Sequence, residues 1–447
     1  EDNKASTKEA KRLAEEFISA TADYPQDLGS YIKLVVNLLK DDYVLAKIRA
    51  VNFIEATFPQ IKVDKSKFVD DILEMSQELD LECIRETVES IKRLRFVNRR
   101  IKDRLFALLR EEEEDEFGAD PILLSVICDA IIDLGIPHFI RFYPTGIKGI
   151  ENKLKQIMRS PDAFVRVAAI NIAFNFKIAN TKYWLNRTKE LLNSWNDYVR
   201  VEVIRIFTRH NIKPPLEIIE MVKQMLPYES YHIVEAEMDK LLWMSGHKDA
   251  DNIIKKRLNI ISKGKPENIK DAARDLGWIG IRQEKILEYF KRAIQRLDRK
   301  IAEKREIDRE VFFDLLFVKK TIIKAMARLN LGSIEDYLNF SYDEEGFIRE
   351  VAAEAFGMRK MTTEKKVVNR LFELLRDDNG STQLAAARSF SEAPPLDKTT
   401  GKRLFSILES FPQEDYWWLR PHLIQALLKI GIKLFKDFEE SLDTEHK

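Results

Sequence analysis

The stretch that decides the fold is residues 343–353, which read DEEGFIREVAA. An acidic turn is followed by an aliphatic residue, by Arg, and then by alanines at helical spacing. The same order returns in residues 160–169, SPDAFVRVAA, and in residues 196–200, NDYVR. Asp, Asn or Ser before an apolar run can cap the first N–H groups of a helix, and small alanines let a second helix approach closely. This self-similarity predicts a stack of helical units rather than one globular core.

Looser copies of this phrase extend in both directions along the chain. Neighbouring copies lie about 34 to 41 residues apart, which is the range of two-helix repeats. Between Ile269 and Ile348 the interval is about twice as long, so we expect one expanded unit there. A further unit is expected over residues 121–135, where an apolar helix is present without the Val-Arg pair. Together these intervals predict roughly ten or eleven antiparallel helix pairs.

The phrase resembles the HEAT and HEAT-like (armadillo-type) repeats, whose second helix typically begins Asp-x-x-Val-Arg-x-x-Ala-x-x-Ala-Leu-Gly. The best match is residues 348–357, and residues 269–277 match nearly as well but are one residue short. The resemblance covers almost the whole chain. It implies an all-α fold, an α-solenoid formed as a superhelix of about ten helix pairs, and it says little about activity because the matching residues hold repeats together. We therefore expect a single continuous solenoid over residues 1–447.

The recurring cation of the phrase has a structural interpretation. In such repeats the Arg tends to reach an acidic turn of the adjacent unit, which would form a ladder along the stack. The expected members of this ladder are Arg85, Arg166, Arg200, Arg349 and Arg420.

Two regions depart from the regular pattern. Residues 283–330 keep an apolar stripe through a highly charged segment and predict a helical pair longer than its neighbours, which either packs into the stack or projects as a partner-binding hairpin. Residues 412–447 are expected to form a C-terminal capping repeat, in which Trp417 and Trp418 either cover the open end or anchor a partner. The other tryptophans fit helical stripes and are expected to pack in the core: Trp184, Trp195, Trp243 and Trp278.

The charges are balanced, with 74 basic and 74 acidic residues. Proteins that grip nucleic acid usually carry a basic excess, so a nucleic-acid partner is not expected. Residues 92–104, KRLRFVNRRIKDR, are nevertheless strongly basic and lie close to the acidic run EEEEDE at residues 111–116. The basic segment is either a solvated helix partly neutralised by this acidic neighbour or a dedicated anion site.

The sequence contains no recognised catalytic, metal or cofactor motif. It lacks a glycine-rich phosphate loop, His-Glu-x-x-His, Gly-x-Ser-x-Gly and an EF-hand loop. Cys83 and Cys128 lie in apolar helical contexts and predict buried free thiols rather than a disulfide or a zinc site, and the six His residues have no ligand spacing. We expect no enzyme activity, no catalytic residue, no cofactor and no metal.

No apolar run is long enough to span a membrane, and no signal peptide is present. We expect a soluble protein and favour the cytoplasm, but the sequence begins at Glu1 rather than Met, so a removed targeting or anchor segment stays open as an alternative.

The predicted function is that of a non-enzymatic scaffold or adaptor, which binds a partner protein along a concave groove and the ridges between repeats. The alternative is a nucleic-acid-binding HEAT-like protein such as an alkylpurine DNA glycosylase-like enzyme; the bilin lyases, which also carry such repeats, are a third class. The partner's identity and the oligomeric state are left open. The candidate contact residues are Trp417, Trp418, Arg93, Arg95, Arg99, Arg100, Lys102, Arg104, Lys291, Arg292, Arg296 and Arg299.

Overall fold

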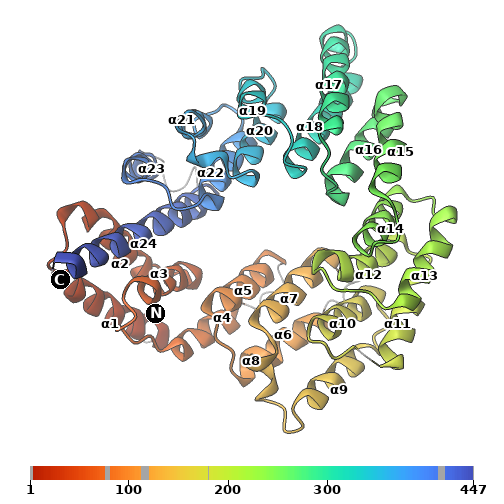
Figure 1. Ribbon diagram of the computed structural model, residues 1–447. Coiled ribbons are helices and arrows are strands. Elements are labelled where there is room, and N and C mark those ends of the chain that lie inside the picture. The colour runs from red at the N-terminus through yellow and green to blue at the C-terminus, as the bar shows by residue number, and fades with distance from the viewer. Residues whose placement is uncertain (1–3, 76–80, 112–119, 180, 411–417, 446–447) are drawn as a thin grey trace. The chain divides into compact units, whose positions relative to one another are not determined.

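The protein is helical throughout the part that the computed structural model describes, residues 4–75, 81–111, 120–179, 181–410 and 418–445, and no strand occurs in these ranges (Figure 1). The chain divides into two compact units, Glu1–Pro227 and Tyr228–Lys447, which we describe separately as unit 1 and unit 2.

Unit 1 consists of short helices joined by tight turns. Its α-helices are α1 (Ala5–Ala20), α2 (Gly29–Lys40), α3 (Val44–Thr57), α4 (Val69–Met75), α5 (Leu81–Leu94), α6 (Arg99–Glu111), α7 (Pro121–Leu134), α8 (Ile136–Ile140), α9 (Ile147–Ile157), α10 (Ala163–Asn175), α11 (Lys182–Leu192), α12 (Asp197–Arg209) and α13 (Leu216–Met225).

Unit 2 continues the same pattern. Its α-helices are α14 (His232–Met244), α15 (Ala250–Lys263), α16 (Pro266–Ile279), α17 (Glu284–Lys304), α18 (Arg309–Arg328), α19 (Ile334–Ser341), α20 (Gly346–Met358), α21 (Lys365–Leu374), α22 (Gly380–Glu392), α23 (Lys398–Ser410) and α24 (Arg420–Glu445).

Each unit has two layers of helices. In unit 1 the helices α3, α5, α7, α10 and α12 pack one on the next, and in unit 2 the helices α14, α16, α18, α20, α22 and α24 do the same. We call these the second-helix layer, because most of them follow a partner helix that packs against them: α2, α4, α6, α9 and α11 in unit 1, and α15, α17, α19, α21 and α23 in unit 2. These partners form the first-helix layer. The protein is therefore an all-α helical-repeat protein, as predicted.

The repeated phrase marks the start of second-layer helices, and its polar residue caps α10 and α12, whereas no side chain caps α20. The Asp162 side chain accepts hydrogen bonds from the backbone N–H groups of Phe164 and Val165 at the start of α10. Asn196 caps α12 in the same way. The alanines that follow are buried, which lets neighbouring second-layer helices lie close together.

Glycine brings two of these helix pairs into backbone contact. A Cβ atom on Gly277 of α16 would lie 2.9 Å from the Cα atom of Ala325 on α18, and one on Gly357 of α20 would lie 2.8 Å from the Ser389 hydroxyl on α22. No side chain larger than hydrogen fits at either position without a shift, so glycine sets the spacing of these helices.

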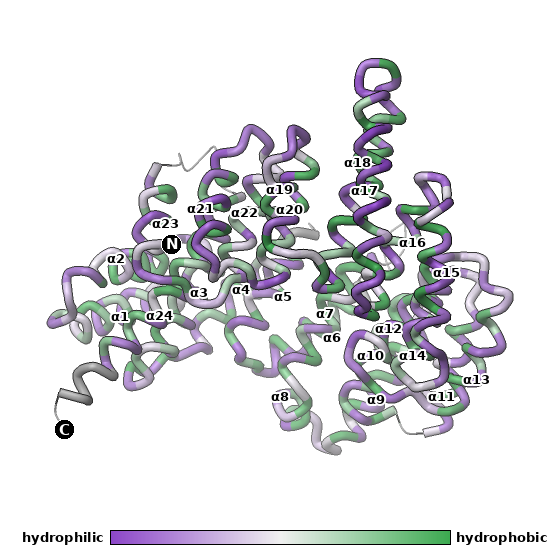
Figure 2. The backbone as a smooth tube through the Cα atoms, turned by 45° about the horizontal axis from the view of Figure 1, so that its top comes forward, coloured by the Kyte–Doolittle hydropathy of each residue, from purple (hydrophilic) through white to green (hydrophobic). Residues whose placement is uncertain are grey.

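The α17–α18 hairpin is longer than its neighbours, with helices of 21 and 20 residues. In Figure 2 it extends beyond α16, α19 and α20 of the same unit. Its end contains Ile307, which is 78% exposed. Arg305 next to it forms ion pairs with Glu344 and Glu345, in the turn before α20. The hairpin thus both packs on its neighbours and reaches past them.

The tryptophans that the sequence predicts to pack in the core are not all buried. Trp184 is buried, and Trp243 and Trp278 are half-buried, but Trp195 is 91% exposed. The prediction for Trp195 is wrong because α11 ends at Leu192 and Asn196 already caps α12, so Trp195 belongs to the turn between them. Trp418 is half-buried, and Trp417 lies outside the described residues.

Cys128 is buried and Cys83 is half-buried, and neither forms a disulfide. Burial raises the pKa of the Cys128 thiol well above its ordinary value.

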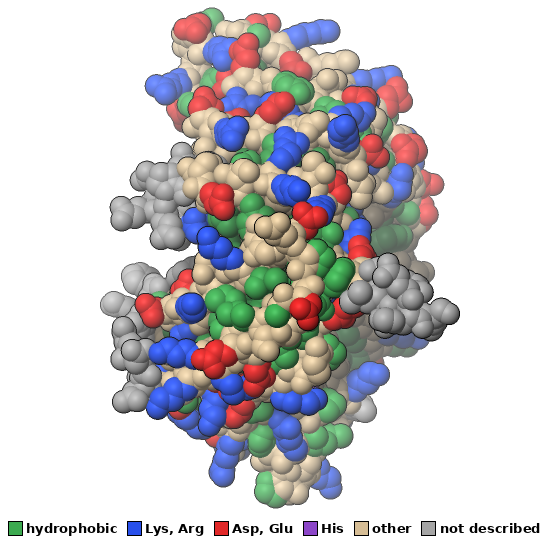
Figure 3. Space-filling model, turned by 90° about the vertical axis from the view of Figure 1, so that its left-hand side faces the viewer, with side chains coloured by type: hydrophobic (Ala, Val, Ile, Leu, Met, Phe, Trp, Pro, Cys, Tyr) green, Lys and Arg blue, Asp and Glu red, His purple; other side chains and the backbone are tan. Residues whose placement is uncertain are grey.

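Within the described ranges, no helix combines the length and the apolar character needed to cross a bilayer. On the face drawn in Figure 3, Lys and Arg side chains are interspersed with Asp and Glu.

Candidate functional site

The second-helix layer of unit 2 carries a surface on which cations alternate with aromatic rings. The residues come from four consecutive helices of this layer, α14, α16, α18 and α20. We call them the cation–aromatic surface: Lys240, Arg274, Trp278, Phe317, Lys320, Lys324, Arg328 and Phe347.

Helix α18 supplies half of this surface because its sequence repeats at helical spacing. Phe317, Lys320, Lys324 and Arg328 are separated by three or four residues, so they share one face of the helix. The opposite face, which includes Leu315, is buried against neighbouring helices. The exposed stripe therefore changes from aromatic near the start of α18 to basic near its end.

A hollow of about 220 Å³ lies between α16 and α18 in this surface. Its lining contains four cations and no carboxylate: Arg274, Phe317, Lys320, Thr321, Lys324, Ala325 and Arg328. A concave site lined only by positive and neutral groups favours an anionic ligand.

Two of these cations are held by carboxylates on α20, outside the hollow. The Nζ atom of Lys320 lies 2.7 Å from Glu350 Oε2, and that of Lys324 lies 2.7 Å from Glu354 Oε2. No carboxylate of the described residues lies within ion-pairing distance of Arg328. Burial lowers the pKa of Arg328 below its ordinary value, although Glu354 opposes this shift. Arg328 is thus an exposed residue whose guanidinium is partly desolvated by its neighbours, and no carboxylate of the described residues pairs with it.

Trp278 lies between two cations. Lys240 Nζ is 5.5 Å and Arg328 Cζ is 5.4 Å from the centre of its ring, both within the range of cation–π contacts. The indole N–H donates a hydrogen bond to Glu237, and Lys240 donates one to the Trp278 carbonyl at 2.9 Å. These contacts fix the indole, so that the two cations have defined positions beside it.

The aromatic end of the surface is formed by α18 and α20. Phe317 is 48% exposed, and its ring centre lies 5.6 Å from that of Phe347. Phe313 meets Phe347 edge to face at 6.3 Å, and Lys320 lies 5.5 Å from the Phe347 ring. This cluster presents apolar area next to the cationic hollow.

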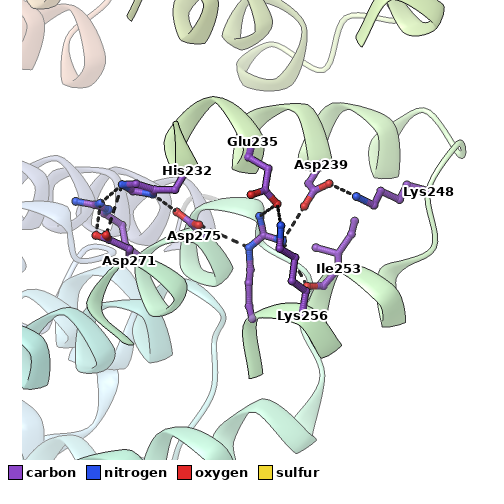
Figure 4. Close-up of polar contacts among 10 residues, drawn as sticks. His232, Glu235, Asp239, Lys248, Ile253, Lys256, Asp271 and Asp275 are labelled. Carbon is purple, nitrogen blue, oxygen red and sulfur yellow. Dashed lines mark hydrogen bonds and ion pairs between the residues drawn. The ribbon is translucent and has the colours of Figure 1, made fainter. Parts of the chain in front are cut away.

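Arg274 is held by a polar network that includes His232, Asp271 and Asp275, which are labelled in Figure 4. Its Nη2 donates to Asp271 Oδ1 at 2.6 Å and to His232 Nε2 at 2.9 Å. A guanidinium can only donate, so Nε2 accepts and the imidazole proton lies on Nδ1, 3.3 Å from Asp275 Oδ1. The chain Asp275–His232–Arg274 therefore fixes the side of the hollow that α16 supplies.

The same network continues into the core of unit 2. Arg257 of α15 is only 2% exposed, and its Nη1 donates to the buried Asp239 at 2.7 Å. Its Nε lies 3.7 Å from Asp275, and Lys248 forms a second ion pair with Asp239. These charges tie α14, α15 and α16 together below the cation–aromatic surface.

The basic segment at residues 93–104 lies in unit 1, on α5, α6 and the turn between them. Arg93 is paired with Glu89 at 2.6 Å, and Arg100 with Asp70. Lys102 is only 7% exposed and points at Asp103 and the Tyr143 ring, so its ammonium is engaged inside the unit rather than offered to a partner. The other members range from half-buried to exposed: Arg104, Arg95 and Arg99.

The basic residues at 291–299 lie on α17 in the first-helix layer, and so are separate from the cation–aromatic surface. Lys291 pairs with Asp336 at 2.8 Å, and Arg292 with Glu288. Arg296 donates to the carbonyls of Ser262 at 2.5 Å and Ile261 at 2.6 Å, at the end of α15. Arg299 is exposed.

Three of the repeated arginines contact turns, and of these Arg349 reaches the turn of the next repeat while Arg200 and Arg166 contact their own. Arg349 reaches the next repeat, where both oxygens of Asp377 lie 2.7 Å from its guanidinium nitrogens. Arg200 donates to the carbonyl of Ser194 at 2.8 Å in its own turn, and Arg166 makes a longer contact of 3.4 Å to Ser160 in the same way. Arg420 lies 3.3 Å from the Leu408 carbonyl, and Arg85 is half-buried on α5.

The sequence interpretation missed the cation–aromatic surface, although one signal for it is present. The apolar stripe of residues 283–330 predicts the helical pair, while Phe317, Lys320, Lys324 and Arg328 form a second stripe on another face of α18. The contribution of α16 could not be found in this way, since it depends on how two repeats stack.

No family model matches the chain, and no curated protein matches it. Among solved structures, an engineered protein aligns with 92% of this chain and 99% of its own, at 16% identity and a TM-score of 0.27. A mutant of Kap121p aligns with 95% of this chain and 45% of its own, at 12% identity and a TM-score of 0.31. At these scores neither likeness carries an inference about function.

Proposed function

We propose that this chain is a HEAT-like scaffold without a catalytic role, which holds a partner protein on the second-helix layer of unit 2. The proposal is supported above all by the hollow between α16 and α18, where four cations lie beside the half-exposed Phe317. An aromatic anchor next to convergent polar groups is the usual composition of a protein-binding hot spot. The HEAT-like assignment rests on the phrase repeated at the start of α10, α12 and α20, which a polar side chain caps at α10 and α12.

The test is capture of a partner from native extract by the tagged full-length chain, followed by cross-linking. We expect cross-links to α16, α18 and α20, and we expect Phe317→Ser to reduce capture. The matched control is Arg299→Glu, an exposed change on the first-helix layer that should leave capture unchanged. Cross-links confined to unit 1 or to the first-helix layer would contradict the proposed site.

A second candidate function is nucleic-acid binding, because four cations lining one hollow beside Trp278 also suit a phosphate next to a stacked base. Phosphate-driven binding weakens steeply as salt rises. A salt titration with duplex and single-stranded DNA therefore separates the two candidates.

A further inference from the structure

We infer that the occupant of the cation–aromatic surface is an acidic protein segment, whose apolar side chain packs on Phe317 and Phe347 while its carboxylates bind at Arg274 and Arg328. This inference rests on the proposed function and specifies the chemistry of the partner. It is argued from the order of groups along α18, from the charges around the hollow and from the state of Arg328.

The order of groups along α18 predicts that the two ends of the bound partner segment differ, one being apolar and the other acidic. Phe317 and Arg328 are eleven residues apart, which is about 17 Å along a helix axis. Phe313 and Phe347 extend the apolar end, and Lys320 and Lys324 lie between it and Arg328. A complementary segment therefore carries an aromatic or aliphatic anchor at one end and acidic residues toward the other.

The charges around the hollow favour carboxylates over a polyphosphate chain. Asp271, Glu350 and Glu354 each lie within 2.7 Å of one of its cations, so the surface carries only a modest excess of positive charge. A continuous phosphate backbone would be repelled by the carboxylates of Glu350 and Glu354 on α20. A short segment with a few carboxylates can instead bind inside the hollow at Arg274 and Arg328, because the residues that line the hollow include no acidic group.

Arg328 is the strongest single pointer to an anion in this surface. Its Cζ atom lies 5.4 Å from the centre of the Trp278 ring, no carboxylate of the described residues pairs with it, and it lines the hollow. A planar guanidinium with free N–H groups binds a carboxylate through two parallel hydrogen bonds. The incoming carboxylate would thus supply the ion pair that Arg328 lacks.

The test uses the full-length chain and a fluorescent synthetic peptide of about 12 residues, with two Phe at one end and a Glu tract at the other. Binding is followed by fluorescence anisotropy. We expect the wild-type chain to bind this peptide, and we expect Arg328→Glu to weaken binding at least about tenfold because it replaces attraction by repulsion. Phe317→Ser should weaken it about as much.

Two controls separate recognition from general charge effects. Arg299→Glu makes the same charge change on an exposed site of α17 and should bind the peptide as the wild type does. A peptide with Gln in place of Glu should bind at least about tenfold more weakly to the wild type. Circular dichroism and the melting temperature of each variant show whether it is folded.

Equal binding of the Glu and Gln peptides, or unchanged binding by folded Arg328→Glu, would overturn the inference. So would steeply salt-dependent DNA binding that Arg328→Glu abolishes, which would assign the hollow to phosphate. If a native partner cross-links to α16 and α18 but the peptide does not compete with it, the inference fails while the proposed function stands. If no partner reaches this layer, the proposed function itself fails.

Discussion

At the scale of single residues, Arg257 shows how much depends on one charge inside unit 2. Its guanidinium contacts Asp239 at 2.7 Å and lies within 4 Å of Asp275 and Glu235. A buried ion pair adds little to stability by comparison with well-packed apolar residues, but removal of one partner leaves the other buried and uncompensated. The importance of Arg257 therefore lies in the cost of losing it.

We expect Arg257→Met to lower the free energy of unfolding by up to about 3 kcal/mol, because the buried Asp239 would keep only Lys248 as an ionic partner and Asp275 would lose a nearby cation. Urea unfolding followed by circular dichroism measures this loss. Lys256→Met removes an exposed cation one residue away and should change stability by less than about 0.5 kcal/mol. The double variant Arg257→Met with Asp239→Leu should recover part of the loss. Equal losses of stability in Arg257→Met and Lys256→Met would refute the argument.

Asp377 gives unit 2 a defined sensitivity to acid. Burial raises the pKa of this carboxyl, but hydrogen bonds from Arg349 and from the backbone N–H of Asn379 outweigh burial and lower it below its ordinary value. The carboxylate therefore stabilises the fold at pH values above about 3.9, the pKa of an unfolded Asp, and this contribution is lost as the pH falls through the lower folded value.

We expect the urea midpoint of the wild type to fall more steeply than that of Asp377→Asn as the pH drops below about 4, because the variant has no carboxyl to protonate at this position. The difference between the two curves isolates Asp377 from the other acidic residues. Parallel curves would mean that the Arg349–Asp377 pair does not contribute to stability.

At the scale of helices, the close approach of α16 and α18 depends on Gly277. A methyl group there would come within 2.9 Å of the Ala325 backbone, so the two helices must move apart to accept it. Alanine favours a helix over glycine by about 1 kcal/mol, but overpacking typically costs about 1 to 3 kcal/mol. The packing effect should therefore dominate.

We predict that Gly277→Ala lowers the stability of the chain and weakens binding of the acidic peptide, because the hollow lies between the helices that separate. Gly380→Ala is the matched control, since no atom lies within 4 Å of the added methyl group at the start of α22. Melting temperature and peptide anisotropy are measured on both variants. If Gly277→Ala is instead more stable than the wild type, α16 and α18 can move apart without a loss of stability, and the prediction is wrong.

The helices that sequence alone predicts well are those whose signal is local. Asp162 and Asn196 cap α10 and α12 through hydrogen bonds to residues two and three positions ahead, so the phrase contains all that is needed to start the helix. The cation–aromatic surface is different, because Trp278, Lys240 and Arg328 come from three repeats and meet only when these stack. The prediction that Trp195 packs in the core is wrong because its spacing fits the apolar stripe of α11, but this helix ends at Leu192, before Trp195.

At the scale of the whole molecule, the fold is a series of contacts between neighbouring repeats. In such a fold stability is approximately a sum of repeat and nearest-neighbour terms, so a local defect need not spread along the chain. The two compact units are consistent with this, since each has its own two layers of helices.

We expect hydrogen exchange in Arg257→Met to accelerate in α14, α15 and α16 while the amides of α5 and α7 keep their wild-type protection. The reason is that, among the described residues, the ionic partners of Arg257 are Glu235, Asp239 and Asp275, which all belong to unit 2. Exchange measured peptide by peptide with mass spectrometry gives the comparison. Uniform acceleration over all helices would instead show that the chain unfolds as one cooperative block.

The indole of Trp278 is confined between Lys240 and Arg328 and lies at the edge of the hollow. Indole emission responds to charges held close to the ring, so any molecule that draws Arg328 away or shields it alters the ultraviolet fluorescence of this one side chain. The difference spectrum between the wild type and Trp278→Phe would isolate that signal from the other tryptophans. The chain thus contains a built-in optical reporter, with which occupancy can be followed without a label.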